Sequence, residues 1–570
     1  MPRLFEPITI RGVEIPNRIV MPPMTTRLAD PDGTVTEELI QYYLARAHGG
    51  TGLLIVEMCS PEPAGRHRAR ELGLFDDRFL PGLRELTARL KAAGARAAVQ
   101  IGHAGGHTRQ DVTGMPPVAP SALPHVVQEV DTRTVVPLAL TREGIRAVIQ
   151  AFADATERAK RAGFDVVEIH GAHGYLIAQF LSPLDNHRTD EYGGSLRNRA
   201  RFALEVLEAC RERVGDLPLI FRVSADEYAA GGVALDDARE LSPWLVEAGA
   251  DALHVSAGCY RSRPSGAVMI PPMSYPEGVF LHLARAIKSC VGVPVIAVGR
   301  LHDPALAERV LAEGQADMVA LGRQLIADPE WPRKVRAGRA DEIRPCISCN
   351  TCVDGMREGA RIQCLVNAMA GREVQFELRP VPRPRSVMVV GGGPAGMEAA
   401  RVLALRGHRV VLVEQSDRLG GQLRLAARAP IFQNVETDAS VLLRFVEFLG
   451  RQLGTVGVAV KLGQAVTPRL VNELKPEVVV LATGASYRVP FRWLIPRLLD
   501  SRWARAGSLK ALLGRTVVKR LVYSVLRTPN SRLERHIREL GVEVHRIGDC
   551  HRPGKTPEAM VEALTLAYRL

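Results

Sequence analysis

Short apolar runs alternate with amphipathic stretches over about the first 330 residues. Each run is nearly continuous and rich in β-branched residues, as expected of a parallel strand buried on both faces. The intervening stretches, such as FLPGLRELTARLKAAGA and LHLARAIKSCVG, have the spacing of amphipathic helices. Eight such units predict an α/β fold, a (β/α)8 TIM barrel, in which functional groups gather at the carboxyl ends of the strands. The predicted strands are Ile19–Pro22, Leu53–Met58, Ala97–Ile101, Val166–His170, Leu219–Ser224, Ala252–Ser256, Val293–Val298 and Met318–Leu321.

A second α/β pattern begins after the linker RPVPRPR, whose prolines make it a semi-rigid spacer. The apolar run Val387–Val390 follows directly and opens the new domain. We therefore expect five segments along the chain. They are the barrel at 1–335, a small cysteine-bearing module at 336–378, the linker at 379–386, a second α/β domain at 387–487 and 541–570, and a short arginine-rich segment at 488–540.

The composition is that of a globular protein, with 46% hydrophobic and 24% charged residues. These values exclude disordered, collagen-like and disulfide-scaffold classes. No run approaches the ~18 apolar residues of a membrane span, and the N-terminal residues show no signal peptide, so we expect a cytoplasmic protein. The net charge of +12 does not indicate nucleic-acid binding, because Arg488–Arg538 holds 13 Lys or Arg against 2 Asp or Glu. The remainder of the chain is nearly neutral.

Four of the nine cysteines lie close together, as Cys346, Cys349, Cys352 and Cys364. Three closely spaced thiolates and a more distant one suit a [4Fe–4S] cluster, in which each sulfur binds a different iron. Four thiolates also satisfy a tetrahedral zinc site, although such sites more often use two separated pairs. The spacing therefore favours a [4Fe–4S] cluster, with zinc and unliganded thiols as the alternatives.

The segment VMVVGGGPAGMEAARVLALRGHRVVLVEQ has the pattern of a dinucleotide-binding site. Gly391, Gly393 and Gly396 follow a predicted strand and open a predicted helix, and Glu414 ends the next strand. The glycines would admit a pyrophosphate to the helix N-terminus, and the glutamate would accept ribose hydroxyl hydrogen bonds. The alternative is an ordinary glycine turn.

The segment HGAHGYL places His170, His173 and Tyr175 at the end of the fourth predicted strand. Two imidazoles at this spacing could bind zinc, but no third ligand stands nearby, and both could equally be structural. The functional interpretation is that both histidines donate hydrogen bonds to a substrate carbonyl and that the tyrosine donates a proton.

The sequence resembles the old yellow enzyme family. The segments that carry the resemblance are this block with its continuation FLSPLDNHRTDEYGGSLRNRARF, MPPMT near the N-terminus, and VGR and LGR after the last two strands. The order of barrel, cysteine motif and GGGPAG domain resembles its longer branch, which contains 2,4-dienoyl-CoA reductases and trimethylamine dehydrogenase. The resemblance implies FMN at the barrel mouth. It implies flavin-ring contacts from Met24, Thr25, Gln100 and Arg222, and a phosphate site at Gly299, Arg300, Gly322 and Arg323.

Two departures from the family bear on the substrate. The amine dehydrogenases of this branch carry tyrosine at the position of His170, and some attach FMN to a cysteine where this chain has Thr25. The His170, His173 and Tyr175 set instead resembles the reductases of activated alkenes. Tyr260 lies where relatives contribute a further active-site group.

In the reductase members a half-domain for NAD(P)H is inserted into the FAD domain. Thr483, Gly484 and Asp549 match the two ends of that FAD domain, yet only about 60 residues separate them, against ~100 for a typical domain. The sequence therefore predicts a reduced domain that binds FAD or only ADP. The basic segment in place of the insertion is either a solvated remnant or a docking patch for an acidic protein or an anionic membrane surface.

Three functions remain from the sequence. The first is an FMN-dependent reductase of an α,β-unsaturated carbonyl or enoyl-type thioester, with NAD(P)H as a possible donor. The second is a dehydrogenase or demethylase of an amine or alicyclic substrate that passes electrons through the cluster to a protein acceptor. The third is a non-enzymatic electron-transfer subunit, against which the intact His170, His173 and Tyr175 speak. An oligomer is compatible with each.

Overall fold

The computed structural model describes residues 2–128, 132–427, 439–487, 527–529 and 532–570. The chain separates into two compact units. The first contains residues 1–340 and 350–362, and the second contains residues 341–349 and 363–570. Within the described residues, no helix is both long and apolar enough to cross a bilayer.

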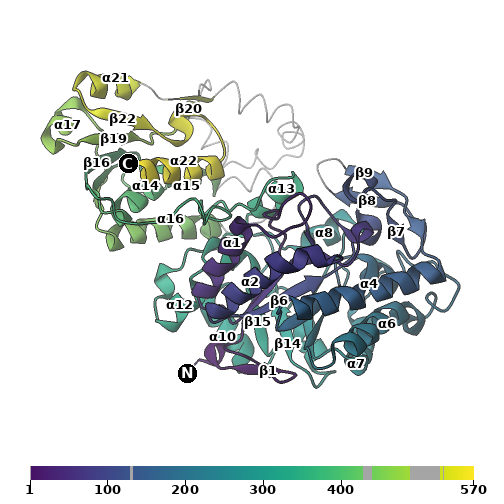
Figure 1. Cartoon of the computed structure of the whole chain (residues 1–570). Coiled ribbons are helices and arrows are strands. Elements are labelled where there is room, and N and C mark those ends of the chain that lie inside the picture. Colours follow the sequence, from purple (N-terminus) through teal and green to yellow (C-terminus); the bar gives the residue numbers. More distant parts are fainter. Residues whose placement is uncertain (1, 129–131, 428–438, 488–526, 530–531) are drawn as a thin grey trace, which may run out of the picture. The chain divides into compact units, whose positions relative to one another are not determined.

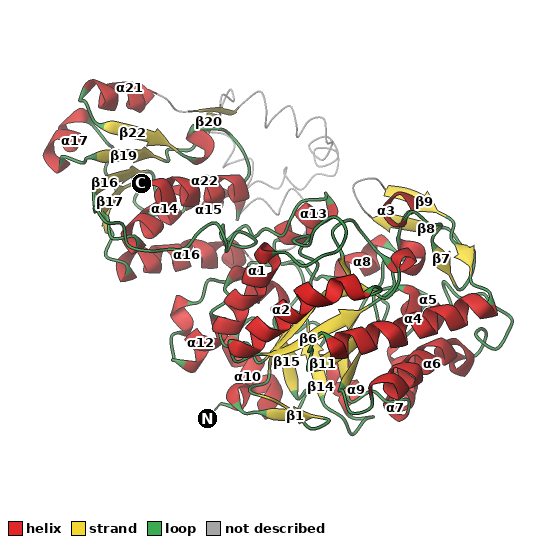
Figure 2. Cartoon of the chain, in the orientation of Figure 1, coloured by secondary structure: helices red, strands yellow, loops and turns green. Residues whose placement is uncertain are grey.

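The first unit is a closed parallel barrel, which confirms the predicted fold (Figures 1 and 2). Closure follows from β3, which pairs in parallel with both β15 and β4. A short ninth strand, β5 (Leu72–Gly73), pairs in parallel with the end of β4. The eight barrel strands are β3 (Ile19–Met21), β4 (Leu53–Ser60), β6 (Arg96–Ile101), β11 (Val166–Gly171), β12 (Leu219–Ser224), β13 (Ala252–Ser256), β14 (Val295–Val298) and β15 (Met318–Ala320).

Two prolines account for small differences between the predicted and observed strands. The strand β3 ends before Pro22, and β14 begins after Pro294. A proline has no backbone N–H to donate to a neighbouring strand, so it is disfavoured inside a central strand.

Amphipathic helices surround the barrel, as Figure 2 shows. Four of them begin at a side-chain cap, where Thr36, Thr141, Ser195 and Asp303 each accept a backbone N–H of the first turn. The surrounding helices are α1 (Glu37–His48), α2 (Leu80–Ala92), α4 (Arg142–Arg161), α6 (Leu196–Val214), α7 (Leu235–Glu247), α9 (Leu281–Lys288) and α10 (Pro304–Ala312).

Shorter elements form the loops of this unit. The antiparallel pairs are β1 (Ile8–Ile10) with β2 (Val13–Ile15) and β8 (His125–Gln128) with β9 (Thr132–Val135), and a parallel pair joins β7 (Val118–Ala119) to β10 (Leu138–Ala139). The short helices are α3 (Gln110–Thr113), α5 (Leu176–Leu181), α8 (Arg263–Met269), α11 (Gly322–Ala327), α12 (Trp331–Arg336) and α13 (Thr351–Arg357).

The barrel interior changes in character along the strands. Side chains near their amino ends form an aliphatic core that includes Leu53, Val166, Ile220 and Ile296. Side chains nearer the carboxyl ends are buried but polar, and they are Glu57, Gln100, Glu168, His170, Arg222 and His254. Because charged groups are almost never buried unless they are paired or functional, this end of the barrel is the candidate site.

The second unit is an α/β domain with the parallel sheet order β18-β17-β16-β19-β22. Helix α14 (Pro394–Leu405) packs against α16 (Ala439–Thr455) and α22 (Thr556–Arg569). Its sheet strands are β16 (Ser386–Val390), β17 (Arg409–Val413), β18 (Ala459–Lys461), β19 (Val478–Leu481) and β22 (Glu543–Arg546). Its remaining helices are α15 (Leu423–Ala426), α17 (Pro468–Leu474) and α21 (Arg532–Glu539).

Between β19 and β22 the chain forms a two-stranded antiparallel ribbon. Its strands β20 (Ala485–Tyr487) and β21 (Arg527–Pro529) pair antiparallel, with Tyr487 opposite Arg527. The paired residues Tyr487 and Arg527 directly flank residues 488–526, which lie outside the described residues.

Candidate active site

The predicted catalytic trio lies together at the carboxyl end of β11. The ring centroids of His170 and His173 are 5.1 Å apart, and those of His170 and Tyr175 are 4.9 Å apart. His173 has a φ of +65° and Gly174 a φ of +77°, so a left-handed turn directs the chain back over the barrel mouth. Hydrogen bonds from the next two strands fix this turn. Ser224 Oγ accepts the His173 N–H at 3.0 Å, and Ser256 Oγ lies 2.7 Å from His173 Nε2.

The trio is buried, and its electrostatics favour neutral hydrogen-bond donors. Burial and the nearby Arg222 guanidinium lower the pKa of His170 and of His173 well below 6.5. Burial and the neighbouring Tyr260 raise the pKa of Tyr175 well above 10. Near neutral pH each histidine therefore has one N–H to donate and Tyr175 keeps its hydroxyl proton.

An apolar wall of buried side chains packs against Tyr175. Met58, Ala104, Tyr260 and Met269 pack with Tyr175 in one buried cluster. The predicted further residue, Tyr260, therefore does lie beside the trio, with its ring centroid 5.7 Å from that of Tyr175.

Arg222 provides a test of whether the barrel mouth suits a flavin. It lies in register with His170 on one side and His254 on the other, and 7% of its surface is exposed. Among the described residues its Nε finds no hydrogen-bond acceptor. A buried guanidinium with an unused donor suits an electron-rich ring edge such as the pyrimidine side of a flavin, so these residues fit FMN.

Gln100, on β6, belongs to a buried hydrogen-bond chain. Its Nε2 donates to Glu168 Oε1 at 2.7 Å, and Glu168 Oε2 is 2.6 Å from His254 Nδ1. This chain fixes the orientation of the Gln100 amide, whose carbonyl oxygen is left available to a ligand ring.

Met24 and Thr25 lie in the loop after β3, a strand on the opposite side of the barrel from β12, which carries Arg222. The adjoining Thr26 donates its backbone N–H to the carboxylate of Glu57, which is fully buried on β4. Burial raises the pKa of Glu57 to about 7. This glutamate thus holds the loop that carries both predicted flavin contacts.

The predicted phosphate residues follow the last two barrel strands, where phosphates commonly bind in this fold. Gly299 has a φ of +118°, and a Cβ there would lie 2.7 Å from Phe280. A Cβ on Gly322 would lie 3.0 Å from Met24 Sδ. Arg300 is buried beside the first glycine, and Arg323 donates to Asn350 Oδ1 at 2.5 Å. The two glycine–arginine pairs therefore follow the neighbouring strands β14 and β15.

The second unit forms a glycine turn before α14. Gly391 has a φ of +110°, and a Cβ on Gly396 would lie 1.9 Å from Gly391 O, so both positions need glycine. The space beside Gly393 is open, and no side chain caps the helix there. Glu414 accepts the Gly392 N–H at 2.6 Å. These residues fit a dinucleotide pyrophosphate at a helix N-terminus.

The other predicted residues of that site lie at the ends of neighbouring elements. Thr483 and Gly484 follow β19, and Gly484 has a φ of +69°. Asp549 follows β22, and its carboxylate accepts the Gly554 N–H at 3.0 Å. Both segments follow carboxyl ends of the same sheet, where such folds bind ligands.

The four cysteines of the motif are half-buried. The chain turns sharply between them, because Ser348 and Asn350 both have positive φ values, of 49° and 57°. The division between the two units runs through this segment. Within the described residues, no three Cys, His, Asp or Glu side chains are arranged to hold a metal ion. The donor chemistry suits an iron–sulfur cluster, which stays a prediction.

Several residues of the site carry no sequence motif. Glu57, Glu168 and His254 lie on barrel strands, and His67 lies on the loop after β4. For the three strand residues, the sequence signal that could have identified them is a polar residue in an otherwise apolar strand, two positions from a buried aliphatic residue. Residues two positions apart in a strand face the same side. A polar residue in a buried strand is either paired with another polar group or part of a functional site.

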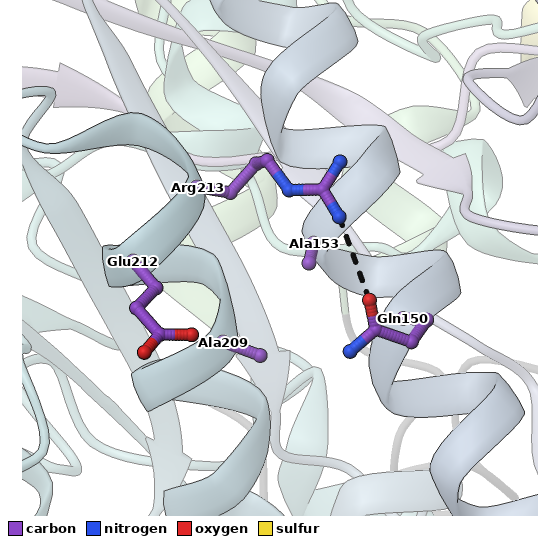
Figure 3. A pocket seen from close by; sticks show the side chains of 5 residues that line it. All are labelled: Gln150, Ala153, Ala209, Glu212 and Arg213. Atoms are coloured by element: carbon purple, nitrogen blue, oxygen red, sulfur yellow. Dashed lines mark hydrogen bonds between the residues drawn. The ribbon is translucent and has the colours of Figure 1, made fainter.

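A hollow also lies on the outside of the barrel, between α4 and α6 (Figure 3). It is lined by Gln150, Ala153, Ala209, Glu212 and Arg213. Arg213 donates to Gln150 at 3.4 Å and pairs with Glu157 at 2.9 Å. Its polar side chains lie on the outer helices α4 and α6, so this hollow lacks the buried acid–base groups of the barrel mouth.

The fold and the site together define a flavin-dependent oxidoreductase. Residues 3–342 match the NADH:flavin oxidoreductase / NADH oxidase family, and residues 386–479 match the FAD dependent oxidoreductases. The protein belongs to the NADH:flavin oxidoreductase / NADH oxidase family. It is 45% identical over 495 residues to the NADH oxidase of Thermoanaerobacter brockii, covering 86% of this chain and 74% of that relative.

Two solved structures are similar over the whole chain. A 2-naphthoyl-CoA reductase in complex with 2-naphthoyl-CoA has a TM-score of 0.88 at 26% identity, covering 100% of this chain and 99% of the other. The histamine dehydrogenase from Rhizobium sp. 4-9 has a TM-score of 0.86 at 26% identity, covering 100% and 96%. The resemblance to the longer branch of the old yellow enzyme family is confirmed.

Proposed function

We propose that the protein reduces an activated C=C bond, in an α,β-unsaturated carbonyl compound or an enoyl-type thioester. The observation that carries this proposal is the trio at the end of β11, in which two neutral imidazoles stand beside a protonated tyrosine. The similarity to a 2-naphthoyl-CoA reductase supports a conjugated thioester as one substrate class.

The residues of the trio have separate tasks in this proposal. His170 and His173 donate hydrogen bonds to the carbonyl oxygen, which becomes more negative as the β-carbon accepts hydride. Tyr175 donates its proton to the α-carbon. The apolar wall packed against Tyr175 restricts the access of bulk water to the carbanion-like centre. When bound, FMN supplies the hydride.

Other groups of this chain would hold the cofactors. Arg222 and Gln100 would contact the flavin ring, with Met24 and Thr25 on the loop that Glu57 holds. The glycines and arginines after β14 and β15 would bind the phosphate of FMN. In the second unit, Gly391, Gly393, Gly396 and Glu414 would bind FAD or ADP. The four cysteines of the motif would hold a [4Fe–4S] cluster.

A second candidate function is the oxidation of an amine, which the similarity to a histamine dehydrogenase favours. Against it stands His170, a neutral hydrogen-bond donor where the family resemblance places tyrosine in the amine dehydrogenases. A donor pair suits a carbonyl oxygen better than a cationic nitrogen. Electrons would then leave through a protein acceptor, for which the basic residues 488–538, mostly outside the described residues, are the proposed docking segment.

The experiment that separates the two is steady-state turnover with contrasting substrates. The purified holoprotein is supplied with NADH or NADPH and a panel of cyclic enones and enoyl thioesters, and separately with amines and an artificial electron acceptor. We expect consumption of enones at the expense of NAD(P)H and no oxidation of amines. Oxidation of amines without reduction of any enone would overturn the proposal.

A further inference from the structure

The barrel holds a fully buried carboxylate, Glu168, next to a residue that would contact the flavin ring. Glu168 lies on β11, two positions before His170, so the two side chains face the same side of the strand. It is in register with Gln100 on β6, the neighbouring strand. A buried charge is costly unless other groups compensate it. The groups around Glu168 therefore show what this carboxylate does.

Both oxygens of Glu168 meet hydrogen-bond donors. Gln100 Nε2 donates to Oε1 at 2.7 Å, and an amide nitrogen can only donate. His254 Nδ1 lies 2.6 Å from Oε2, and burial lowers the pKa of this histidine, so its ring is neutral and carries one proton. That proton is on Nδ1, which faces the carboxylate, since Nε2 has no hydrogen-bond partner among the described residues. A carboxyl group that accepts from two donors is ionised.

The positive charge that accompanies Glu168 is the guanidinium of Arg222. Arg222 is buried on β12, the strand next to β11, in register with His170. Burial lowers its pKa, and the negative charge of Glu168 acts in the opposite direction. Because Gln100 and His254 are neutral, these two residues together with Glu168 and Arg222 carry no net charge.

We infer that Glu168 lowers the reduction potential of FMN bound at the barrel mouth, because its negative charge opposes that of Arg222. Hydride transfer from NAD(P)H adds one negative charge to the flavin ring, and hydride transfer to an acceptor removes it. Arg222 stabilises the charged, reduced ring and Glu168 destabilises it, and both effects are strong in the low-dielectric interior. This role does not depend on which compound the protein reduces, so it goes beyond the proposed function.

The opposed charges have a consequence for both half-reactions. Arg222 alone would favour uptake of hydride by the flavin and would hinder its release to an acceptor. The carboxylate restores part of the driving force for release. Glu168 does this without touching a reacting atom, since its two oxygens are engaged by Gln100 and His254.

The midpoint potential of the flavin in Glu168→Gln tests this role. Anaerobic reductive titration of the holoprotein against a reference dye gives that potential. The new amide can keep both contacts, because its oxygen accepts from Gln100 and its nitrogen donates to Nδ1 of His254, whose proton moves to Nε2. The change therefore removes the charge and keeps the packing. We expect the equilibrium constant for two-electron reduction to rise by ~10-fold, which corresponds to ~30 mV.

Three further variants serve as controls. Glu168→Asp keeps the charge and should keep the equilibrium constant within ~2-fold of wild type. Arg222→Gln removes the opposite charge and should lower the constant. Asp251→Asn is the matched control, because Asp251 precedes β13 at the other end of the barrel, where it accepts the Leu219 N–H at 2.9 Å. It should leave the potential unchanged, and FAD in the second unit should keep its potential in every variant.

The outcomes are distinct. A potential of Glu168→Gln equal to or below that of wild type overturns the inference alone, and so does an equal rise in Asp251→Asn. If Glu168→Gln loads no FMN, Glu168→Met is the second uncharged variant. Failure of both to bind oxidised FMN overturns the inference, because the carboxylate would then hold the cofactor instead of setting its potential. If wild-type protein reduces no enone, the proposed function fails, and the potentials of the variants still decide this inference.

Discussion

At the scale of single residues, the barrel mouth is governed by how burial changes protonation. The same low-dielectric surroundings keep His170 and His173 neutral and keep the proton on Tyr175. Three groups that titrate over a wide pH range in water therefore share one protonation state near neutrality. This is the state in which all three can donate hydrogen bonds to a carbonyl compound.

Replacing Tyr175 with phenylalanine removes the proposed acid and keeps the ring in its apolar wall. We expect flavin reduction to be unchanged and alkene reduction to slow by ~10²–10⁴-fold, the usual range for a lost general acid. Stopped-flow measurement of the two half-reactions checks this. Tyr192→Phe is the control, because the hydroxyl of Tyr192 hydrogen-bonds Glu205 on an outer helix. Normal alkene reduction by Tyr175→Phe would show that another group supplies the proton.

Glu57 gives a prediction about pH and stability. Its pKa rises from 4.5 to about 7 on folding, so between those values the folded chain binds a proton that the unfolded chain has lost. The folded state therefore loses stability as the pH rises through this window, by about 3 kcal/mol at most. Glu57→Gln abolishes this loss, and its Tm relative to wild type should rise between about pH 5 and about pH 8. A Tm difference that is the same at both pH values would contradict the prediction.

The residues that the sequence did and did not reveal differ in a physical way. Strand burial on both faces leaves a continuous apolar run, so the barrel could be predicted, and its geometry then placed His170 and Tyr175 at the mouth. Glu57 and His67 have meaning only through partners on other strands, and the Tyr175 partner of His67 is 108 positions away. No local pattern encodes such a pairing.

At the scale of elements, a buried ion cluster joins two segments of the second unit. Glu398 on α14 pairs with Arg401 at 2.8 Å and with Arg344 at 3.2 Å, and the two arginines lower its pKa to about 2. Arg344 lies two residues before Cys346. The start of the cysteine segment is thus anchored to the helix that follows the glycine turn.

The cysteine segment itself gives a prediction about metal content. Protein purified without oxygen should contain about four irons and four acid-labile sulfides per chain, and Cys349→Ala should lose them. Cys290→Ala is the control, because Cys290 is also half-buried but lies after α9, outside the motif. Iron and sulfide analysis with metal quantification tests this. Stoichiometric zinc in place of iron would instead support the tetrahedral alternative.

At the scale of the whole molecule, the distribution of sites predicts where reducing equivalents enter. If residues 488–540 replace a nicotinamide-binding half-domain, then NAD(P)H must reach the flavin at the barrel mouth and compete there with the alkene. A chain ending at Arg385 should therefore retain FMN reduction by NAD(P)H at a rate comparable to the full chain. Loss of this reduction in a folded, FMN-loaded barrel would show that the second α/β domain receives the hydride.

The ribbon of β20 and β21 has a consequence for the history of this architecture. Because Tyr487 and Arg527 are neighbours in that ribbon, the polypeptide leaves the sheet and returns to it at a single junction. A connection that starts and ends at neighbouring residues can differ in length without altering the strand order of a sheet. Doubling the length of a flexible connection of this kind costs only ~0.6 kcal/mol in closure entropy. A short basic segment and an entire nucleotide-binding half-domain can therefore occupy the same position in the chain without changing the parent sheet.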